Sequence, residues 1–281
     1  MSADITAIIL TKNESKNIKD CIESISSLVK RIVVVDSGSV DNTVEISKSM
    51  GAEVFFHCFE NYSNQFNWGI DNVGVSTAWI LRIDADERFT KELCSEIDDL
   101  IENPKGDNTN GIILEAKLFF MGKWIKHGGS KKRKLMLFKT GFGRIEDRMM
   151  DEHTILFAGK SINAKEKFLH YDFKDLNFFV DKLNWYATRE VKDFNVYLAN
   201  NSTYNHSLFD KKITSTRKMK YGFYYKLPLF FRTWLLFIYF YYFKLGFLDG
   251  VEGYIYHYLY QRWYRLLVDA KIYEERQKRR S

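Results

Sequence analysis

The chain of 281 residues holds two prolines, three cysteines and no uninterrupted apolar run of bilayer-spanning length. So few prolines argue against a proline-rich linker or a repeat array. Cys21, Cys58 and Cys94 are scattered without CxxC spacing, which predicts neither a disulfide framework nor a zinc site and suits a reducing compartment. The apolar run Ile5–Leu10 is short and follows no basic region, so we expect no signal peptide and a cytoplasmic protein.

What the chain has instead is ample apolar material, 46% of its residues, which excludes disorder. Its charge is uneven: residues 205–281 carry 15 Lys/Arg against 6 Asp/Glu, whereas residues 1–204 carry 27 against 30. Of the 46 aromatic residues, 20 lie between Tyr221 and Tyr264. This division predicts an enzyme-like domain over 1–204 and a basic, aromatic, helical C-terminal region over 205–281.

The first hundred residues alternate between short buried runs and helical periodicity. Strands are expected at Ile5–Leu10, Ile32–Val35, Ala52–Phe56 and Trp79–Ile83, with helical spacing of apolar residues between them. Strands alternating with helices at this spacing are typical of an α/β fold with a mostly parallel central sheet.

Polar residues follow three of these strands, at Thr11–Glu14, Asp36 and Asp84–Glu87. The carboxyl ends of parallel strands meet at one edge of a sheet, where ligands of such folds bind. A single carboxylate there is more often a helix cap, but three acidic loops together favour a site.

Asp84-Ala85-Asp86 is the sharpest chemical feature. Two carboxylates flanking one small residue after a buried strand suit a hard divalent cation such as Mg²⁺ or Mn²⁺, which leaves coordination positions for phosphates and water. No Walker loop or GxGxxG accompanies the triplet, so neither of those cradles is expected to bind phosphate.

Three blocks together resemble the nucleotide-sugar motifs of family 2 glycosyltransferases with the GT-A fold. They are Thr11–Glu14, Val34–Thr43 and Asp84–Glu87. Further on, Lys244–Gly250 and Trp263–Arg265 resemble the branch that builds bacterial lipopolysaccharide core, O-antigen and capsule. The resemblance implies an inverting enzyme that moves a sugar from a nucleotide-sugar donor, expected to be UDP-linked.

The resemblance also implies roles by position. Thr11, Asn13 and Glu14 would line the nucleotide pocket, Asp36 would bond the uracil or ribose, Asp84 would face the ribose and the metal, and Asp86 would bind the metal. The metal, Mg²⁺ or Mn²⁺, would stabilise the charge that grows on the departing nucleoside diphosphate.

An inverting transfer also needs a general base for the acceptor hydroxyl. By the resemblance this base falls on Glu152 first and on Asp151 second, with Asp147 a third candidate; chemistry alone does not separate the first two. The alternative is a surface acidic pair that ends a strand.

The chain departs from the family pattern at Met136, where an arginine commonly precedes Leu-Phe; Arg133 or Lys134 is expected to substitute, or the contact is absent. His127 either shapes the acceptor pocket or is structural. Gln261-Arg262-Trp263 lacks the Q-x-x-R-W spacing of processive members, which indicates that one sugar is added.

The run Thr233–Phe243 is eleven uncharged residues between Arg232 and Lys244, too short to span a membrane. Aromatic residues with basic flanks favour an interfacial helix on an anionic membrane surface, where a lipid-linked saccharide or lipopolysaccharide acceptor would be presented. Trp234, Phe237 and Tyr241 are expected on its lipid side. We therefore expect a peripheral protein on the inner face of the cytoplasmic membrane; the alternative is a packed helical subdomain or a dimer interface.

Two other functions use some of the same features. A sugar nucleotidyltransferase would need a glycine-rich, basic first loop, which Thr11–Glu14 is not. A basic RNA- or membrane-binding protein without catalysis is the alternative from another class. No nucleic-acid module is recognisable, so no nucleic-acid partner is expected.

Overall fold

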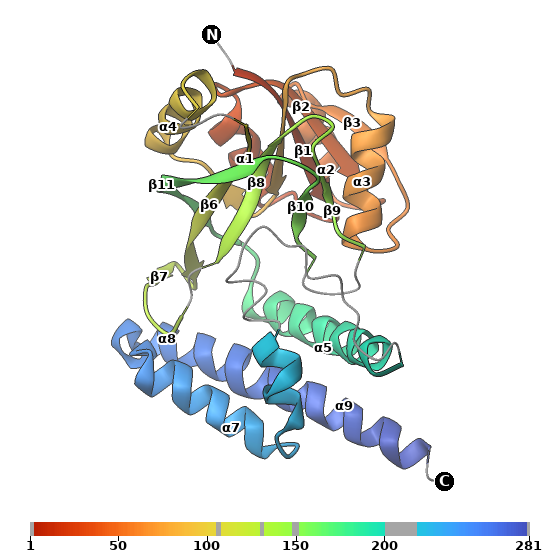
Figure 1. Ribbon diagram of the computed structural model, residues 1–281, viewed down its shortest axis with the longest axis vertical. Helices are drawn as coiled ribbons and strands as arrows, with labels where there is room; N and C mark the ends of the chain where they lie inside the picture. The colour runs from red at the N-terminus through yellow and green to blue at the C-terminus, as the bar shows by residue number, and fades with distance from the viewer. Residues whose placement is uncertain (1–2, 105–107, 130–131, 148–151, 200–217, 280–281) are drawn as a thin grey trace. The chain divides into compact units, whose positions relative to one another are not determined.

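The structure, a computed structural model, describes residues 3–104, 108–129, 132–147, 152–199 and 218–279 (Figure 1). It divides into two compact units. The first, called here the sheet unit, comprises Met1–Phe119, Lys131–Asp147 and Glu152–Phe173. The second, the helical unit, comprises Phe120–Ser130, Arg148–Asp151 and Lys174–Ser281.

A large mixed sheet forms the centre of the sheet unit. Its strands are β1 (Ala3–Thr11), β2 (Val29–Asp36), β3 (Glu53–Phe56), β4 (Trp79–Asp84), β5 (Glu87–Arg88), β6 (Thr109–Phe120), β8 (Arg133–Lys139) and β11 (Lys160–His170), in the order β3-β2-β1-β4-β8-β6-β11-β5. Strands β1 to β4 pair in parallel, and β8 runs antiparallel to both β4 and β6. A small second sheet joins β9 (Gly143–Ile145) to β10 (Thr154–Leu156). The four strands expected in the first 84 residues are therefore confirmed.

Helices cover both faces of this sheet (Figure 1). They are α1 (Ile18–Ile25), α2 (Thr43–Ser49), α3 (Tyr62–Asn72) and α4 (Lys91–Glu102). Because side chains alternate across a strand, β1 supplies both cores. Ile5 and Ile9 join the cluster that includes α1 and α4, while Ile8 joins the cluster that includes Phe66 of α3. A strand buried on both faces reads as an unbroken apolar run, which is why β1 could be recognised in the sequence.

The strand register determines which polar residues meet. Thr11 at the end of β1 lies opposite Asp36 at the end of β2, and Leu10 lies opposite Asp84 at the end of β4. The three polar loops expected at one sheet edge are therefore adjacent in space.

The longest segment of the helical unit, Lys174–Ser281, includes residues before the boundary expected after residue 204, because α5 packs with the C-terminal helices. Its elements are β7 (Lys123–Ile125), α5 (Leu176–Ala199), η1 (Tyr224–Lys226), α7 (Phe231–Ile238), η2 (Tyr239–Phe243), η3 (Gly246–Asp249), α8 (Gly250–His257), η4 (Tyr258–Trp263) and α9 (Tyr264–Lys278). Leu183, Ala187 and Val191 of α5 share a core with Val268 and Ile272 of α9. Helical spacing on both partners explains the pairing.

One expectation about this unit is wrong. Phe237 is 6% exposed and belongs to the interior, where its ring stacks on that of Tyr241 with the centroids 5.2 Å apart. The reason is that this side of α7 packs against η4, where the ring centroids of Phe237 and Tyr258 are 5.9 Å apart. Trp234 is exposed, as expected.

Within the described residues, no single helix is long and apolar enough to cross a membrane. The two segments Phe231–Phe243 and Gly246–Lys278 together have the length and apolar composition of a membrane span, but their axes are bent by 68° at the break between them.

Candidate active site

The end of β2 is organised around the carboxylate of Asp36, which is 3% exposed. Its Oδ1 accepts the backbone N–H groups of Gly38 and Ser39, each at 2.8 Å, and its Oδ2 accepts the hydroxyl of Thr11 at 2.8 Å and that of Ser39. Gly38 has φ +87°, a conformation that favours glycine. Asp36 thus fixes the turn after β2 and ties it to the end of β1.

The loop after β1 is joined to the same turn. Asn13, in the left-handed region at φ +55°, accepts the N–H of Val40 on its side-chain oxygen and donates its own N–H to Ser39 Oγ. Glu14 donates its N–H to Thr43 Oγ1 at 2.7 Å. The loops carrying Thr11, Asn13, Glu14 and Asp36 therefore form one hydrogen-bonded structure at the sheet edge.

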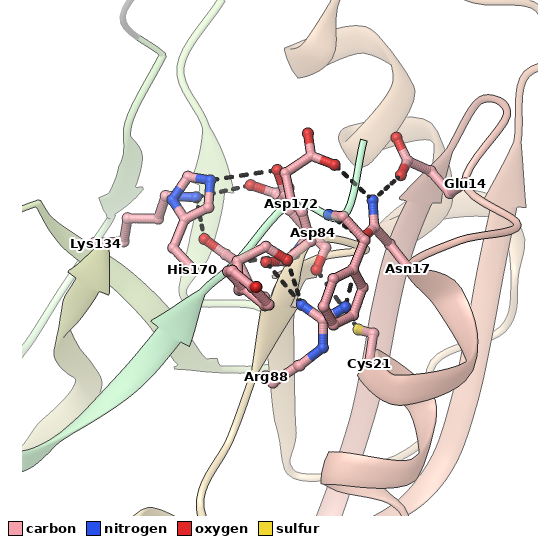
Figure 2. Close-up of polar contacts among 12 residues, drawn as sticks. Glu14, Asn17, Cys21, Asp84, Arg88, Lys134, His170 and Asp172 are labelled. Carbon is pink, nitrogen blue, oxygen red and sulfur yellow. Dashed lines mark hydrogen bonds and ion pairs between the residues drawn. The ribbon is translucent and has the colours of Figure 1, made fainter. Parts of the chain in front are cut away.

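Asp84, at the end of β4, is surrounded by donors from its own chain (Figure 2). Its Oδ1 accepts the hydroxyl of Tyr62 at 2.7 Å, and its Oδ2 accepts Lys134 Nζ at 2.7 Å. The same ammonium lies 2.5 Å from Glu87 Oε1, and Glu87 Oε2 accepts the N–H of Asp84 at 2.9 Å. Asp84, Glu87 and Lys134 form a compact cluster in which the ammonium of Lys134 pairs with both carboxylates.

The electrostatics of this cluster keep Asp84 ionised. Burial by itself raises the pKa of the Asp84 carboxyl, but Lys134 and Arg82 lower that pKa to about 2. Burial raises the pKa of Glu87, an effect that Lys134 only partly offsets. Burial lowers the pKa of Lys134, yet Asp84 and Glu87 together hold it above its ordinary value.

Asp86 has a different neighbour. Its Oδ2 lies 3.3 Å from Nε2 of His170, the last residue of β11, and both side chains are mostly buried (Figure 2). Among the described residues no three His, Cys, Asp or Glu side chains are grouped as metal ligands. A carboxylate and an imidazole that converge nevertheless fit a cation whose remaining positions are filled by a diphosphate and water. Asp84 fits less directly, because its two oxygens already accept Tyr62 and Lys134.

A second network connects the first loop to the end of β11 (Figure 2). The buried Asn17 donates to Glu14 Oε2 and to Asp172 Oδ1, each at 2.9 Å, and its oxygen accepts the N–H of Phe173. Arg88 donates to the Tyr171 carbonyl at 2.5 Å. Residues after β11 are therefore part of the same edge as the loop after β1.

Of the two leading candidate bases, the structure describes Glu152. Glu152 is half-buried, two residues before β10, whereas Asp151 lies outside the described residues. Thr154 of β10 accepts Arg82 at 3.3 Å, and Arg82 donates to Tyr62, the donor to Asp84. This chain of contacts connects the strand after Glu152 to the acidic cluster.

Asp147, the third candidate base, is exposed and lies 3.4 Å from the hydroxyl of Ser63.

Tyr62 and His170 were not anticipated from the sequence. Their partners Asp84 and Asp86 lie 22 and 84 residues away along the chain, so no local pattern connects them. One sequence signal could have found His170: the polar residues His170-Tyr171-Asp172 directly follow the apolar pair Phe168-Leu169, as expected at the end of a strand. Of the two proposed substitutes for the missing arginine, Lys134 reaches the acidic cluster, whereas Arg133 donates to Asn163.

Comparison with known proteins identifies the family. The pattern of Glycosyl transferase family 2 matches residues 6–158, more than half of the chain. The chain belongs to this family. The α/β GT-A fold class and the glycosyltransferase activity expected from the motifs are confirmed.

This glycosyltransferase is similar to several known proteins. An uncharacterized glycosyltransferase of Rickettsia felis is 30% identical over 205 residues, covering 67% of this chain and 69% of the relative. The lipopolysaccharide core biosynthesis glycosyltransferase LpsC of Rhizobium meliloti is 26% identical over 191 residues, covering 66% and 69%. A crystal structure of glucosyl-3-phosphoglycerate synthase from Mycobacterium tuberculosis matches with a TM-score of 0.33 at 22% identity, over 42% of this chain and 44% of that chain, too slight a likeness to support an argument.

Proposed function

We propose that this glycosyltransferase moves one sugar, with inversion, from a UDP-linked donor to a lipid-linked saccharide or lipopolysaccharide precursor. One observation supports the proposal above all others. The polar ends of β1, β2, β4 and β11 gather at one sheet edge, where Asp86 faces His170 beside the charge-compensated Asp84. An acidic edge of this kind suits a nucleoside diphosphate held through a divalent cation.

On the donor side, Thr11, Asn13, Glu14 and Asp36 would form the nucleotide pocket, with Asp36 acting mainly through the turn that it fixes. Asp86 and His170 would hold Mg²⁺ or Mn²⁺. Such a cation supplies positive charge to the departing diphosphate. Asp84 would face the ribose, and it would share the cation only by giving up Lys134.

On the acceptor side, a carboxylate would take the proton of the attacking hydroxyl as the new glycosidic bond forms and the bond from sugar to phosphate breaks. We assign this role to Glu152 first and to Asp151 second. The contacts from Thr154 through Arg82 to Tyr62 support the placement, because they anchor the following strand next to the acidic cluster.

The class of acceptor rests on two supports. LpsC, a relative, is named for lipopolysaccharide core biosynthesis. The helical unit has the exposed aromatic side chains and basic flanks expected of a protein that works on a membrane surface. We place the enzyme on the inner face of the cytoplasmic membrane as a peripheral protein without a nucleic-acid partner.

The metal assignment is tested with Asp86→Asn. We expect transfer to be abolished and Mn²⁺-dependent binding of UDP, measured by calorimetry, to be lost while the circular dichroism spectrum is unchanged. Asp71→Asn is the matched control, because Asp71 is a carboxylate paired with Arg144 on the surface. Full activity of the wild-type enzyme in EDTA would refute the assignment.

The base is tested by Glu152→Gln and Asp151→Asn side by side. The variant of the true base should lower kcat by about 10²- to 10⁴-fold with little change in donor affinity. If neither variant does so and Asp147→Asn does, the base is Asp147. Retention of the anomeric configuration, detected by NMR of the product, would exclude the inverting mechanism.

A further inference from the structure

The sharp bend after η2 carries a dense group of exposed apolar side chains. We call residues 242–251, from the end of η2 to the start of α8, the elbow. Phe243 is 75% exposed and Val251 is 70% exposed. Other exposed members are Tyr242, Leu245, Phe247 and Leu248. Scattered exposed apolar residues are ordinary, but a contiguous group marks an interaction surface.

The backbone holds these side chains outward. Leu245 adopts φ +60°, which a branched residue occupies only at a cost, typically on the order of 1 kcal/mol. The turn is fixed by the N–H of Lys244, which donates to the Tyr239 carbonyl at 2.9 Å, and by that of Leu245, which donates to the Tyr242 carbonyl. The elbow therefore has a defined backbone conformation that hydrogen bonds hold in place.

A clasp within the helical unit reinforces the turn. Asp249, 4% exposed, accepts both the N–H of His127 at 2.8 Å and its ring Nδ1 at 2.7 Å. Gly128 donates its N–H to the Lys244 carbonyl at 2.8 Å, and Lys123 pairs with Glu252 at 3.1 Å. The carboxylate of Asp249 and the carbonyl of Lys244 are therefore used in the clasp, and the large exposed side chains of the elbow other than Lys244 are apolar or aromatic.

Basic residues outnumber acidic residues around the elbow. Between Thr233 and Leu248 the one charged residue is Lys244, which is exposed. Over residues 218–263 the chain has six Lys/Arg and two Asp/Glu; of the two acids, Asp249 is buried and Glu252 is paired with Lys123. An apolar surface with cations and no free carboxylate complements a lipid surface of negative charge.

The elbow suits shallow insertion. It is bent by 68° between two helices, neither of which is long and apolar enough to cross a bilayer by itself. Tyr242 in the elbow and Tyr239 and Tyr254 on either side of it are all about half exposed, and amphipathic rings of this kind prefer the headgroup level of a membrane.

We propose that the elbow is the membrane anchor of the enzyme: Phe243, Leu248 and Val251 enter one leaflet of an anionic bilayer, and Lys244 lies at its phosphates. This inference rests on the membrane association in the proposed function and identifies the residues that would produce it. It differs from the expectation drawn from the sequence, in which the lipid face lay along Trp234, Phe237 and Tyr241.

The test is flotation of the full-length protein with vesicles of phosphatidylcholine alone or with added phosphatidylglycerol. Phe243→Ser, Leu248→Ser and Val251→Ser together should lower the partition coefficient on anionic vesicles by about a hundredfold or more, given the apolar area removed. The matched control replaces Trp185, Leu198 and Tyr273 by serine, three side chains of the helical unit that are 45%, 55% and 48% exposed. The control should bind within about threefold of the wild type.

Lys244→Gln separates the charge from the apolar contact. It should weaken binding to anionic vesicles by about fivefold and leave binding to neutral vesicles unchanged. If the folded elbow variant floats like the wild type, the proposal is wrong. It is also wrong if that variant changes the oligomeric state without lipid, by sedimentation, while vesicle binding persists, because the elbow is then an interface between copies.

UDP binding in the presence of Mn²⁺, measured on the same variants, distinguishes this proposal from the proposed function. The elbow variant should bind UDP as the wild type does. Loss of vesicle binding with UDP binding intact supports the anchor. An enzyme that floats through the elbow yet binds no nucleotide would overturn the proposed function and leave the anchor standing.

Discussion

At the scale of single residues, Lys134 holds the acidic cluster together. Two largely buried carboxylates, Asp84 and Glu87, share its ammonium, and Met136, in the position where an arginine was expected, is fully buried in the core. Removing one member of a buried charged network is costly because it leaves the remaining charges uncompensated.

We therefore expect Lys134→Met to lower the free energy of unfolding by about 3–5 kcal/mol. The pKa of Asp84, about 2 in the folded wild type, is below its ordinary 3.8. Ionised Asp84 therefore contributes stability above pH 3.8 that is lost as the pH falls toward 2. Without Lys134 the folded-state pKa of Asp84 rises, so the difference from the unfolded-state value narrows and this acid-induced loss should be smaller.

Urea unfolding between pH 2 and pH 7 measures both effects. Lys134→Arg should recover much of the stability, and Lys30→Met, at an exposed ion pair, should change it by less than about 1 kcal/mol. A Lys134→Met protein as stable as the wild type would show that the cluster is not compensated by this lysine.

At the scale of elements, two glycines allow close packing around His257, the last residue of α8. This ring is fully buried, and both of its nitrogens lack hydrogen-bond partners within the described part of the chain. A Cβ built on Gly128 would stand 2.0 Å from the ring, and one on Gly246 would stand 2.7 Å from it. Glycine is needed at both positions for α8 to pack.

Burial lowers the pKa of His257 from 6.5 to about 4, against an opposing effect of Asp249. Between these values the unfolded chain binds a proton that the folded chain does not, so stability should fall as the pH decreases from 6.5 to 4, by up to about 3 kcal/mol.

His257→Asn removes this titration. The variant should be less stable than the wild type at neutral pH, but the dependence of its Tm on pH between 4 and 6.5 should be smaller. An unchanged dependence would mean that another group is responsible.

At the scale of the whole molecule, the two units have separate cores. Buried charged groups connect the helices within the helical unit. Arg232 pairs with Asp269, and Glu190 accepts hydrogen bonds from Arg265, Tyr225 and Tyr264. Independent cores commonly unfold as separate cooperative transitions.

Calorimetry should therefore resolve two transitions. Asp269→Asn should lower the one that belongs to the helical unit, since it leaves Arg232 buried without its carboxylate. UDP with Mn²⁺ should raise the transition of the sheet unit, because a ligand stabilises the part that binds it. A single transition shifted by both changes would show that the units unfold together.

Local sequence determined the elements of the sheet unit and the residues at its edge. Apolar runs buried on both faces specify β1, β2 and β4 whatever surrounds them, and polar residues directly after such runs must lie at the carboxyl edge. For that reason the meeting of Thr11, Asp36 and Asp84 could be predicted from the chain alone.

Tertiary structure decided the partners of those residues. Lys134 and His170 reach Asp84 and Asp86 from 50 and 84 positions away, because β8 and β11 enter the same sheet in an order that no local pattern specifies. Phe237 was assigned to the lipid side because helical spacing shows which residues share a face but not what covers that face; in the fold, η4 packs there and Tyr258 meets Phe237. The composition predicted an aromatic and basic C-terminal region. Which of its side chains are exposed depends on the tertiary structure, including the turn at Leu245.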